Sequence, residues 1–534
     1  MVGIIKGDMI YPAQTSLIPV QVALVRFLEQ NGLPSAFGNY PYWYLGTTPF
    51  RYLTGPILPG LCLALHRIFP AFNFFEIMFG VIGISWVFGA IGVYLLVISL
   101  ANSSTSEESL PPAPRLRRAG RATVRGVLAA VFYLFGPIVP FLFRFSDGIY
   151  LIAFSFLPFV YAQYAKFLRG EKRETAVLLC LLIAFVILLD SLIIPTLLLG
   201  MAAIFLAQVG WKRVEEKLKS SLVFLFFSFL VATLWYTPSY WLTLLGAPSL
   251  GGIGVIGVIG ELGKLLPSAL AIGAAVFSAR FFKKKDLLRD FCFYWLFIFG
   301  FLTLVRFLSD PDFWLDWVSY NLELQLGLSI LGGLLIGRLL GHPNYIRMKI
   351  IRINPNILVL SVLCLLCSVF WVLVVNRYVL GTLRRDITKT VEYRIGSQLS
   401  QIAKPGERVF LSGSTAFWLN SLDFCPDRGK TQIETLKNAE KCTEIVQVRG
   451  GRDQASVDPN WRKAVWEIRE GAVADDAERV LKTLKISYLV VHTEESEEFY
   501  HDFVYPEKFE EIRSLVKVYD RRGDIIYKVM NVVK

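Results

Sequence analysis

The stretch FFEIMFGVIGISWVFGAIGVYLLVISL at residues 74–100 decides the fold class of this chain of 534 residues. About 20 consecutive apolar residues are enough for a helix to cross the roughly 30 Å hydrocarbon core of a bilayer. Comparable apolar runs follow at 126–143, 149–168, 174–189, 192–208, 221–242, 265–282, 288–306, 322–340 and 356–376. The sequence therefore predicts a polytopic α-helical membrane domain with about ten spans.

The composition agrees with this class. The hydrophobic fraction is 54% and the charged fraction is only 18%, with a mean hydropathy of +0.50. A net charge of +12 can indicate a nucleic-acid partner. Here, however, the Lys and Arg residues lie in short loops beside apolar segments, which is the pattern of the positive-inside rule. We therefore expect the lipid bilayer as a partner, and no nucleic acid.

The basic loops define a topology. Lys and Arg concentrate in the loop before residue 126 and in RGEKRE (169–174), WKRVEEKLK (211–219), KKKDLLR (283–289) and GHPNYIRMKIIR (341–352). The alternate loops are poor in them: RFSDG (144–148), GAPSLGGIGVIGVIGELG (246–263) and SDPDFWLDW (309–317). If the basic loops are cytoplasmic, the tail after residue 376 is extracytoplasmic. We expect a multi-pass protein of the cell membrane.

The expected domains are a first outer loop at 1–73, a transmembrane domain at 74–376 and a small extracytoplasmic α/β domain at 377–534. The same parity places residues 1–50 outside with no span before them. Either a preceding N-terminal helix is missing, or the ambiguous apolar segment 54–70 spans the membrane and the N-terminus is cytoplasmic. The first explanation is preferred, because it places Asp8, a candidate for chemistry that is described below, on the outer side.

The tail carries the patterns of an α/β domain. RVFLSG (408–413) and SYLVVHT (487–493) are short β-branched or aromatic runs typical of strands. WRKAVWEIREG (461–471) and DAERVLKTLK (476–485) have helical spacing, the first ending at Gly471. VKVYDRRGDIIYKVM (516–530) predicts a hairpin that turns at Arg522-Gly523-Asp524.

The first outer loop contains the strongest candidates for chemistry. Asp8 lies near its start, and Arg51 follows a cluster of aromatic residues: Tyr40, Tyr42, Trp43 and Tyr44. The aromatic cluster fits an interfacial belt, which is common at membrane boundaries. It also fits a groove in which aromatic rings stack on a sugar, Arg binds phosphate and a carboxylate takes a proton. Composition alone favours the belt.

The other outer loops add further candidates. Arg144 and Asp147 lie in one loop, although Asp-Gly is also a common turn dipeptide. A later loop adds Arg306, Asp310, Asp312, Trp314 and Asp316, whose carboxylates either bind a divalent cation or belong to a solvated loop. The solvated loop is the favoured interpretation, and a divalent cation is the alternative.

Two smaller features concern an acid between two spans and a pair of cysteines in the tail. Asp190 is interpreted as a turn residue between two spans, with a functional acid at membrane depth as the alternative. Cys425 and Cys442 in the tail could form a disulfide on the outer side. No Cys and His residues have the spacing of a zinc site.

Several motifs resemble a known family. These are the GD-x-x-x-P stretch at 7–12, PYWYLGTTPFRY at 41–52, QVRGGRDQASVDPNW at 447–461 and LVVHTEESEEFYHDF at 489–503. Together they resemble the prokaryotic multi-pass family labelled "membrane protein, 6-pyruvoyl-tetrahydropterin synthase-related". Such proteins look like members of the GT-C superfamily of integral membrane glycosyltransferases. The pterin part of the label implies little, because no zinc-ligating His set is present.

The resemblance implies a GT-C-like membrane domain and a sugar donor carried on polyprenyl phosphate. The acceptor would be an extracytoplasmic glycan, lipid or protein. In that class an acidic residue of the first outer loop is catalytic or positions the acceptor. This implies Asp8 as the first catalytic candidate and Asp147 as the second. The alternatives are a transporter or flippase of a lipid-linked saccharide, and a non-catalytic scaffold for a surface polymer.

Overall fold

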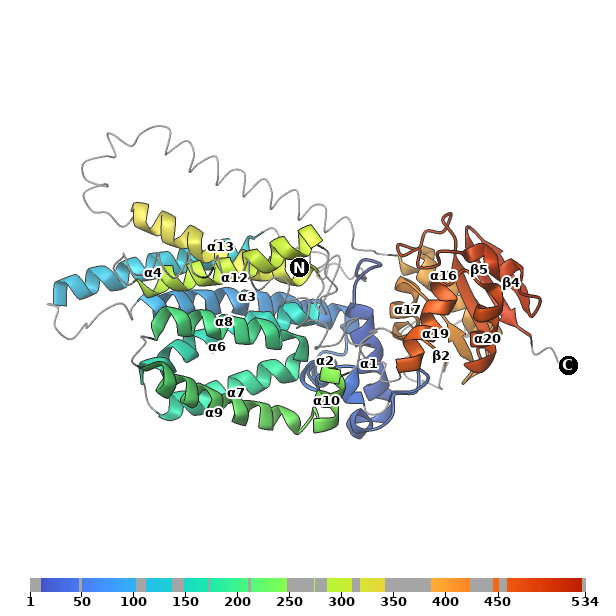
Figure 1. The fold of residues 1–534 in the computed structure, drawn as a ribbon, viewed down its shortest axis with the longest axis horizontal. Coiled ribbons are helices and arrows are strands. Elements are labelled where there is room, and N and C mark those ends of the chain that lie inside the picture. The colour runs from blue at the N-terminus through green and yellow to red at the C-terminus, as the bar shows by residue number, and fades with distance from the viewer. Residues whose placement is uncertain are drawn as a thin grey trace, which may run out of the picture.

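The structure is a computed structural model of the whole chain. It describes residues 11–47, 50–101, 112–136, 148–170, 173–209, 213–246, 273, 286–309, 317–340, 386–422, 445–450 and 459–530. Long helices lie side by side in a bundle, and a smaller domain with a β-sheet lies beyond one end of it (Figure 1). Between the two lies α1 (Ile18–Asn31), whose first eleven residues are buried or half-buried and whose last three are exposed.

The N-terminal part and the bundle consist of helices. The elements before the bundle are α1, η2 (Leu33–Phe37), η3 (Phe50–Tyr52) and α2 (Ile57–Ile68). The bundle follows with α3 (Phe74–Ala101), α4 (Pro112–Leu134), α6 (Gly148–Arg169), α7 (Arg173–Leu189), η5 (Ser191–Ile193), α8 (Ile194–Gln208), α9 (Val214–Thr233), α10 (Pro238–Gly246), α12 (Leu287–Ser309) and α13 (Trp317–Leu340).

Four helical segments of the described chain are long and apolar enough to cross a membrane: Phe74–Ala101, Gly148–Arg169, Ser191–Gln208 and Leu287–Leu304. Their outward faces are apolar too. On α3 the large exposed side chains include Ile84, Val87, Phe88, Ile91 and Leu95. A helix that is apolar on both its packed and its open face suits a lipid environment and not water.

Contacts at the two ends of α3 show how the bundle is oriented relative to the C-terminal domain. Arg169 at the end of α6 donates a hydrogen bond of 3.3 Å to the carbonyl oxygen of Ser99 near the end of α3. At the other end of α3, the ring of Phe75 stacks on Trp418 of the C-terminal domain, with 5.6 Å between ring centroids. The C-terminal domain therefore lies at the end of the bundle opposite to Arg169.

Basic residues occupy that distant end. Trp235, just after α9, donates a hydrogen bond of 3.2 Å to Thr54 beside the C-terminal domain. The start of α9, with Lys217 and Lys219, therefore lies at the same end as Arg169. The described basic loops are thus separated from the C-terminal domain by the length of the bundle, as the predicted alternation of loops requires. The extracytoplasmic side of the C-terminal domain stays a prediction.

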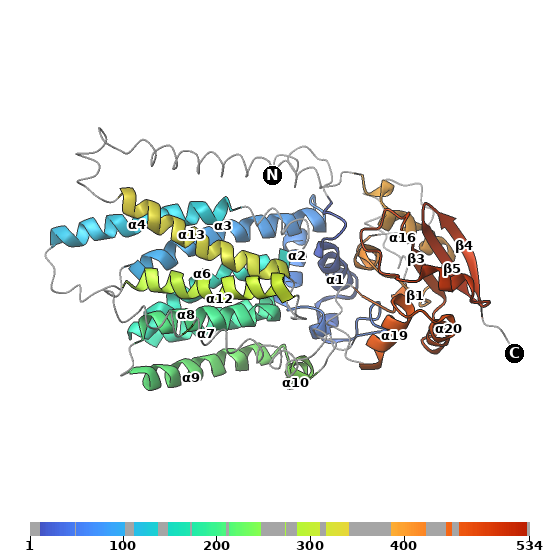
Figure 2. The ribbon, with the colours of Figure 1, turned by 45° about the horizontal axis from the view of Figure 1, so that its top comes forward.

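The C-terminal domain is α/β. Its elements are η8 (Ile387–Lys389), α16 (Val391–Ile402), β1 (Arg408–Phe410), α17 (Ser414–Trp418), η9 (Leu419–Ser421), β2 (Val446–Gln447), α19 (Pro459–Arg469), α20 (Ala474–Thr483), β3 (Tyr488–His492), η11 (Pro506–Glu510), β4 (Leu515–Arg521) and β5 (Asp524–Val529). The five strands have the order β2-β1-β3-β5-β4. Strand β1 is parallel to β2 and β3, whereas β5 is antiparallel to β3 and β4 (Figure 2).

The central strand of this sheet is covered on both faces. All five residues of β3 are buried, because helices and loops cover both of its faces. The hairpin of β4 and β5 turns through Arg522 and Gly523, whose φ angles are +53° and +75°. Two consecutive positive φ angles are typical of a type I′ turn, which matches the twist of paired strands.

Most predicted elements of the described chain are confirmed. The predicted strands at 408–413 and 487–493 contain β1 and β3, the two tail helices are α19 and α20, and the hairpin is β4–β5. Two predictions were wrong. The span predicted at 126–143 overlaps α4, which runs from Pro112 to Leu134 and so includes part of the predicted basic loop. The apolar run 221–242 is not one helix, because α9 ends at Thr233 and α10 begins at Pro238. Proline lacks the N–H needed to continue a helix and fits its first turn.

Three further predicted segments are an ambiguous apolar segment and two spans near or after residue 265. The ambiguous segment 54–70 contains α2, which has 12 residues and is too short to cross a bilayer alone. The predicted spans 265–282 and 356–376 lie outside the described residues, apart from residue 273.

Candidate functional site

The first loop, residues 32–56, joins α1 to α2 and faces the C-terminal domain (Figure 1). Within it Tyr40 and Thr47 form an antiparallel bridge, with N···O distances of 2.9 and 2.8 Å. We call residues 40–47 the first-loop hairpin. The N–H of Phe50 donates to the carbonyl oxygen of Gly38 at 3.1 Å and so closes the base of this hairpin.

An apolar cavity of about 420 Å³ lies where this loop meets the ends of α1, α7 and α9. Its volume lies within the range of small-molecule sites, about 300–1,000 Å³. Every lining residue is apolar: Leu28, Leu33, Ala36, Phe37, Phe50, Pro56, Pro59, Gly60, Leu188, Val231, Leu234 and Trp235. Such a lining favours a hydrocarbon chain, because it offers no partner to the hydroxyl groups of a sugar.

Arg51 does not line this cavity itself, but it is the next residue after one that does. It belongs to η3 and directly follows Phe50, which lines the cavity. Its side chain is half-buried, and the described part of the chain offers it no hydrogen bond or ion pair. A guanidinium group can bind phosphate oxygens bidentately. The first loop therefore combines an apolar cavity with an available cation.

The end of the first loop is fixed to the bundle. A Cβ atom added at Gly55 would lie 1.9 Å from the carbonyl oxygen of Leu188, so only glycine allows this approach to α7. Asp190 follows α7 and caps η5, where its carboxylate accepts from the N–H of Leu192 at 3.1 Å. The interpretation of Asp190 as a turn residue is confirmed.

The four predicted sugar-binding aromatics belong to the first-loop hairpin, and three of them are buried. The exposed fractions are 0% for Tyr40 and Trp43 and 8% for Tyr44, whereas Tyr42 is half-buried. The ring of Phe27 on α1 meets Tyr40 edge-on, with 5.0 Å between centroids. These rings thus pack inside the protein, where they exclude a large apolar area from water. Their stacking on a sugar stays a prediction.

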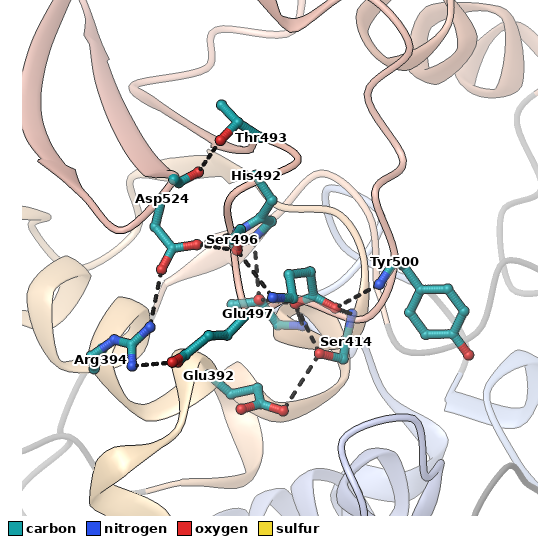
Figure 3. A network of polar contacts seen from close by, with 12 residues as sticks. Glu392, Arg394, Ser414, His492, Thr493, Ser496, Glu497, Tyr500 and Asp524 are labelled. Carbon is teal, nitrogen blue, oxygen red and sulfur yellow. Dashed lines mark hydrogen bonds and ion pairs between the residues drawn. The ribbon is translucent and has the colours of Figure 1, made fainter.

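A chain of polar side chains lies in the C-terminal domain, beyond the ends of β1 and β3 (Figure 3). Asp524 contacts Nδ1 of His492 at 2.9 Å and a guanidinium nitrogen of Arg394 at 3.3 Å. Nε2 of His492 lies 3.3 Å from the hydroxyl of Thr415. The order Asp, His, hydroxyl is also that of catalytic triads, which are recognised by geometry and not by sequence.

Burial and hydrogen bonds give these polar side chains a structural role. Thr415 is 0% exposed and His492 is 2% exposed, so no substrate reaches them in this arrangement. The hydroxyl of Thr415 donates to Glu498 at 2.7 Å, away from the imidazole that would have to activate it. Burial acts to raise the pKa of Asp524, but hydrogen bonds from His492 and Ser496 hold that pKa below its ordinary value. These hydrogen bonds and ion pairs hold the loops in one arrangement.

A second polar cluster joins the loops that follow β1 and β3. The carboxylate of Asp502 pairs with Arg469 at 2.9 Å and Arg449 at 3.1 Å, and accepts from the N–H of Gly413 at 3.0 Å. Ser412 also donates to it. Burial acts to raise the pKa of Asp502, but Arg469 and Arg449 hold that pKa below its ordinary value.

The bundle contains a buried acid that the sequence analysis did not identify. Glu323 of α13 is 0% exposed, and its Oε1 accepts hydrogen bonds from Tyr150 of α6 and, at 2.8 Å, Thr196 of α8. Trp295 of α12 donates to the backbone carbonyl of Glu323 at 2.7 Å. Among the described residues, Oε2 of Glu323 has no partner. The available signal was a single acid in the apolar run 322–340, since acids at membrane depth are functional candidates.

The remaining predicted site residues lie outside the described residues: Asp8, Arg144, Asp147, Asp310, Asp312, Trp314 and Asp316. Arg306 belongs to α12, but its side chain is outside them, as are Cys425 and Cys442. Their roles stay predictions. Within the described ranges, no three His, Cys, Asp or Glu residues are grouped so that they could hold a metal ion.

Comparison with known proteins gives little further information. No family model and no curated protein sequence matches this chain. Among solved structures, the chain is similar to the crystal structure of ArnT from Cupriavidus metallidurans in the apo state, with 12% sequence identity and a TM-score of 0.44. The match covers 98% of this chain and 96% of that one.

Proposed function

We propose that this protein is an integral membrane glycosyltransferase. It transfers a sugar from a polyprenyl-phosphate carrier to an acceptor on the side of the membrane that holds the C-terminal domain. The observation that carries the proposal is the apolar cavity of about 420 Å³, which is lined by Phe50, the residue before Arg51. The cavity suits part of an isoprenoid chain, and the neighbouring guanidinium suits the phosphate to which that chain is linked.

The proposed reaction is an inverting displacement at the anomeric carbon. The acceptor hydroxyl oxygen forms a bond to this carbon while the bond from the carbon to the carrier phosphate breaks. Asp8 takes the hydroxyl proton or orients the hydroxyl, and Asp147 is the second candidate for this role. Arg51, together with Arg144 or Arg306, neutralises the charge on the departing lipid phosphate.

The sugar would lie between the cavity and the C-terminal domain. In the first-loop hairpin, Tyr42 has the more accessible ring and is the most suitable for stacking on a sugar. Trp314 and the remaining hairpin aromatics are further candidates. The separation of the C-terminal domain from the described basic loops supports an extracytoplasmic acceptor, because basic loops favour the cytoplasm.

A direct assay tests the proposal. The purified full-length protein receives a polyprenyl-phosphate-linked sugar and an envelope extract as a source of acceptors. We expect release of polyprenyl phosphate together with labelling of an acceptor. The Asp8→Asn variant should fold normally and lose transfer, because it lacks the proton-accepting carboxylate. Full activity of this variant would remove Asp8 from the mechanism, and no release by the wild-type protein would contradict the proposed function.

One observation favours a second candidate, a flippase for a lipid-linked saccharide. Transporters often place ionisable groups inside the bundle, and Glu323 is a fully buried acid bonded to Tyr150 and Thr196. Movement of the intact lipid-linked sugar across a vesicle membrane, without release of polyprenyl phosphate, would identify this function. Its loss in the Glu323→Gln variant would connect the movement to this residue. If the assays show neither release of polyprenyl phosphate nor movement of the lipid-linked sugar, the scaffold role is the remaining candidate.

A further inference from the structure

The first-loop hairpin extends the β-sheet of the C-terminal domain. The N–H of Gln447 donates to the carbonyl oxygen of Tyr42 at 2.7 Å, and the carbonyl oxygen of Gln447 accepts from Leu45 at 3.4 Å. Its neighbours Val446 and Val448 instead donate toward β1. This alternation is the bonding of an inner strand, with a neighbour on each side. Strand β2, an edge of the sheet, is thus covered by residues of the first loop.

One side-chain oxygen strengthens this junction. Oδ1 of Asn420, in η9, accepts from Nε1 of Trp43 at 3.0 Å and from Nε2 of Gln447 at 2.6 Å. The ring of Trp43 lies against Gly450, where an added Cβ atom would be 2.6 Å from the Cβ of Trp43. The Asn420 amide therefore binds both the hairpin and β2. The close contact of Trp43 with Gly450 leaves no space there for a larger residue.

The hairpin also connects the junction to the cavity. It begins after Phe37 and ends before Phe50, and both of these side chains line the cavity. The backbone hydrogen bond from Phe50 to Gly38 and the stacking of Phe50 on Phe27, with 6.1 Å between centroids, hold the base of the hairpin against α1. A displacement of the hairpin would move Phe37 and Phe50, and with them Arg51.

We propose that Asn420 and Trp43 are positioning residues for the lipid carrier. Their hydrogen bond holds the first loop so that Phe37 and Phe50 shape the cavity and Arg51 is presented beside it. The C-terminal domain thereby contributes to donor binding through the hairpin, without a contact between Asn420 and the donor. This inference rests on the proposed function, because it takes the cavity to be the site of the carrier chain.

Matched variants of Asn420 separate positioning from folding. Asn420→Leu has a similar size but no acceptor, so it leaves the N–H groups of Trp43 and Gln447 unpaired. Asn420→Asp keeps an oxygen acceptor at the same place and is the control. Trp43→Phe removes the donor from the other side and keeps an aromatic ring, and it carries the test if Asn420→Leu does not fold.

Two measurements on the full-length protein in lipid nanodiscs decide the matter. The first is equilibrium binding of radiolabelled polyprenyl phosphate, which has no sugar and so permits no turnover. The second is hydrogen exchange in peptides that cover residues 38–53. Loss of these hydrogen bonds should weaken binding by about threefold to tenfold in Asn420→Leu and Trp43→Phe, with faster exchange in the first loop. Asn420→Asp should bind within about twofold of the wild-type protein.

The outcomes are distinguishable. If the wild-type protein binds the probe and Asn420→Leu binds it equally well despite faster exchange in the first loop, the positioning role is wrong and the proposed function stands. Unchanged exchange in both variants would show that the hydrogen bond does not hold the loop, which also overturns the inference. If the wild-type protein binds no polyprenyl phosphate, the proposed function fails and the positioning role fails with it.

Discussion

The hydroxyl of Thr196 donates to Oε1 of Glu323 at 2.8 Å and so joins α8 to α13 inside the helical bundle. Tyr150 donates to the same oxygen from α6. Three helices thus meet at one carboxylate oxygen in a region surrounded by apolar side chains. Interhelical hydrogen bonds of this kind are stabilising because a lone hydroxyl or carboxylate in an apolar medium has no alternative partner.

The effect of a substitution at Glu323 on stability should depend on whether the new side chain keeps a hydrogen-bond acceptor. Glu323→Gln keeps an oxygen for Tyr150 and Thr196 and should unfold at nearly the wild-type temperature. In Glu323→Leu the hydroxyls of Tyr150 and Thr196 can still bond each other across 2.8 Å, but both lose the carboxylate as acceptor. This loss should lower the free energy of unfolding by about 1–3 kcal/mol. Thermal unfolding of the two detergent-solubilised variants measures the difference. Equal stability of the two would show that these hydrogen bonds contribute nothing.

Asp502 should make the stability of the C-terminal domain depend on acid pH. Its folded-state pKa lies below its ordinary value of 3.8, so its ion pairs contribute fully above that value. The contribution should disappear as the pH falls through the lower folded-state pKa. Asp502→Asn should cost roughly 3 kcal/mol at neutral pH, because Arg449 and Arg469 lose the carboxylate that pairs with both of them. The gap between wild type and variant should narrow below about pH 4 in thermal melts; a gap independent of pH would contradict this assignment.

Gly55 should not tolerate even one additional methyl group. In Gly55→Ala the new Cβ meets the carbonyl oxygen of Leu188 at 1.9 Å, so the first loop must move away from α7. We expect a loss of about 1–3 kcal/mol in stability together with weaker binding of polyprenyl phosphate. Gly83→Ala in α3 is the control, since a Cβ there meets nothing within 4 Å. A similar effect of both variants would indicate a general response to alanine and no specific contact.

Arg51 should act through its bidentate geometry as well as its charge. Arg51→Ala should weaken the binding of polyprenyl phosphate by about tenfold to a hundredfold, because a charged hydrogen bond contributes roughly 1.5–3 kcal/mol. Arg51→Lys keeps the charge but not the planar fork, so it should bind with intermediate affinity. Binding of the corresponding polyprenol, which lacks the phosphate, should be unchanged in both variants. If the polyprenol is affected equally, Arg51 contributes to the cavity and not to the phosphate.

Local patterns in the sequence predicted much of the architecture. Apolar runs of suitable length marked the helices, and β-branched runs marked β1 and β3, because each pattern reports the environment of its own residues. The Arg522-Gly523 turn followed from glycine's tolerance of positive φ. The division of α9 from α10 was missed, although Pro238 was visible, because apolarity continues across the break.

Relations between distant residues could not be predicted in the same way. The burial of Trp43 depends on Asn420 and Gly450, which lie in another domain. The composition of the first loop alone therefore suggested an interfacial belt or a sugar-binding surface instead. Glu323 was read as part of an apolar span, because its partners Tyr150 and Thr196 belong to other helices. Such constellations require knowledge of which helix faces meet.

The junction between the first-loop hairpin and β2 has a consequence for biogenesis. In chain order, 377 residues separate Trp43 from Asn420. During synthesis the hairpin must therefore remain without its partner until nearly the entire chain has been made, and long-range strand pairing of this kind is slow. A fragment that contains only the C-terminal domain would expose the unpaired edge of β2 and the buried ring of Trp418. Such edges recruit other chains, so we expect the fragment to aggregate unless the hairpin is supplied with it.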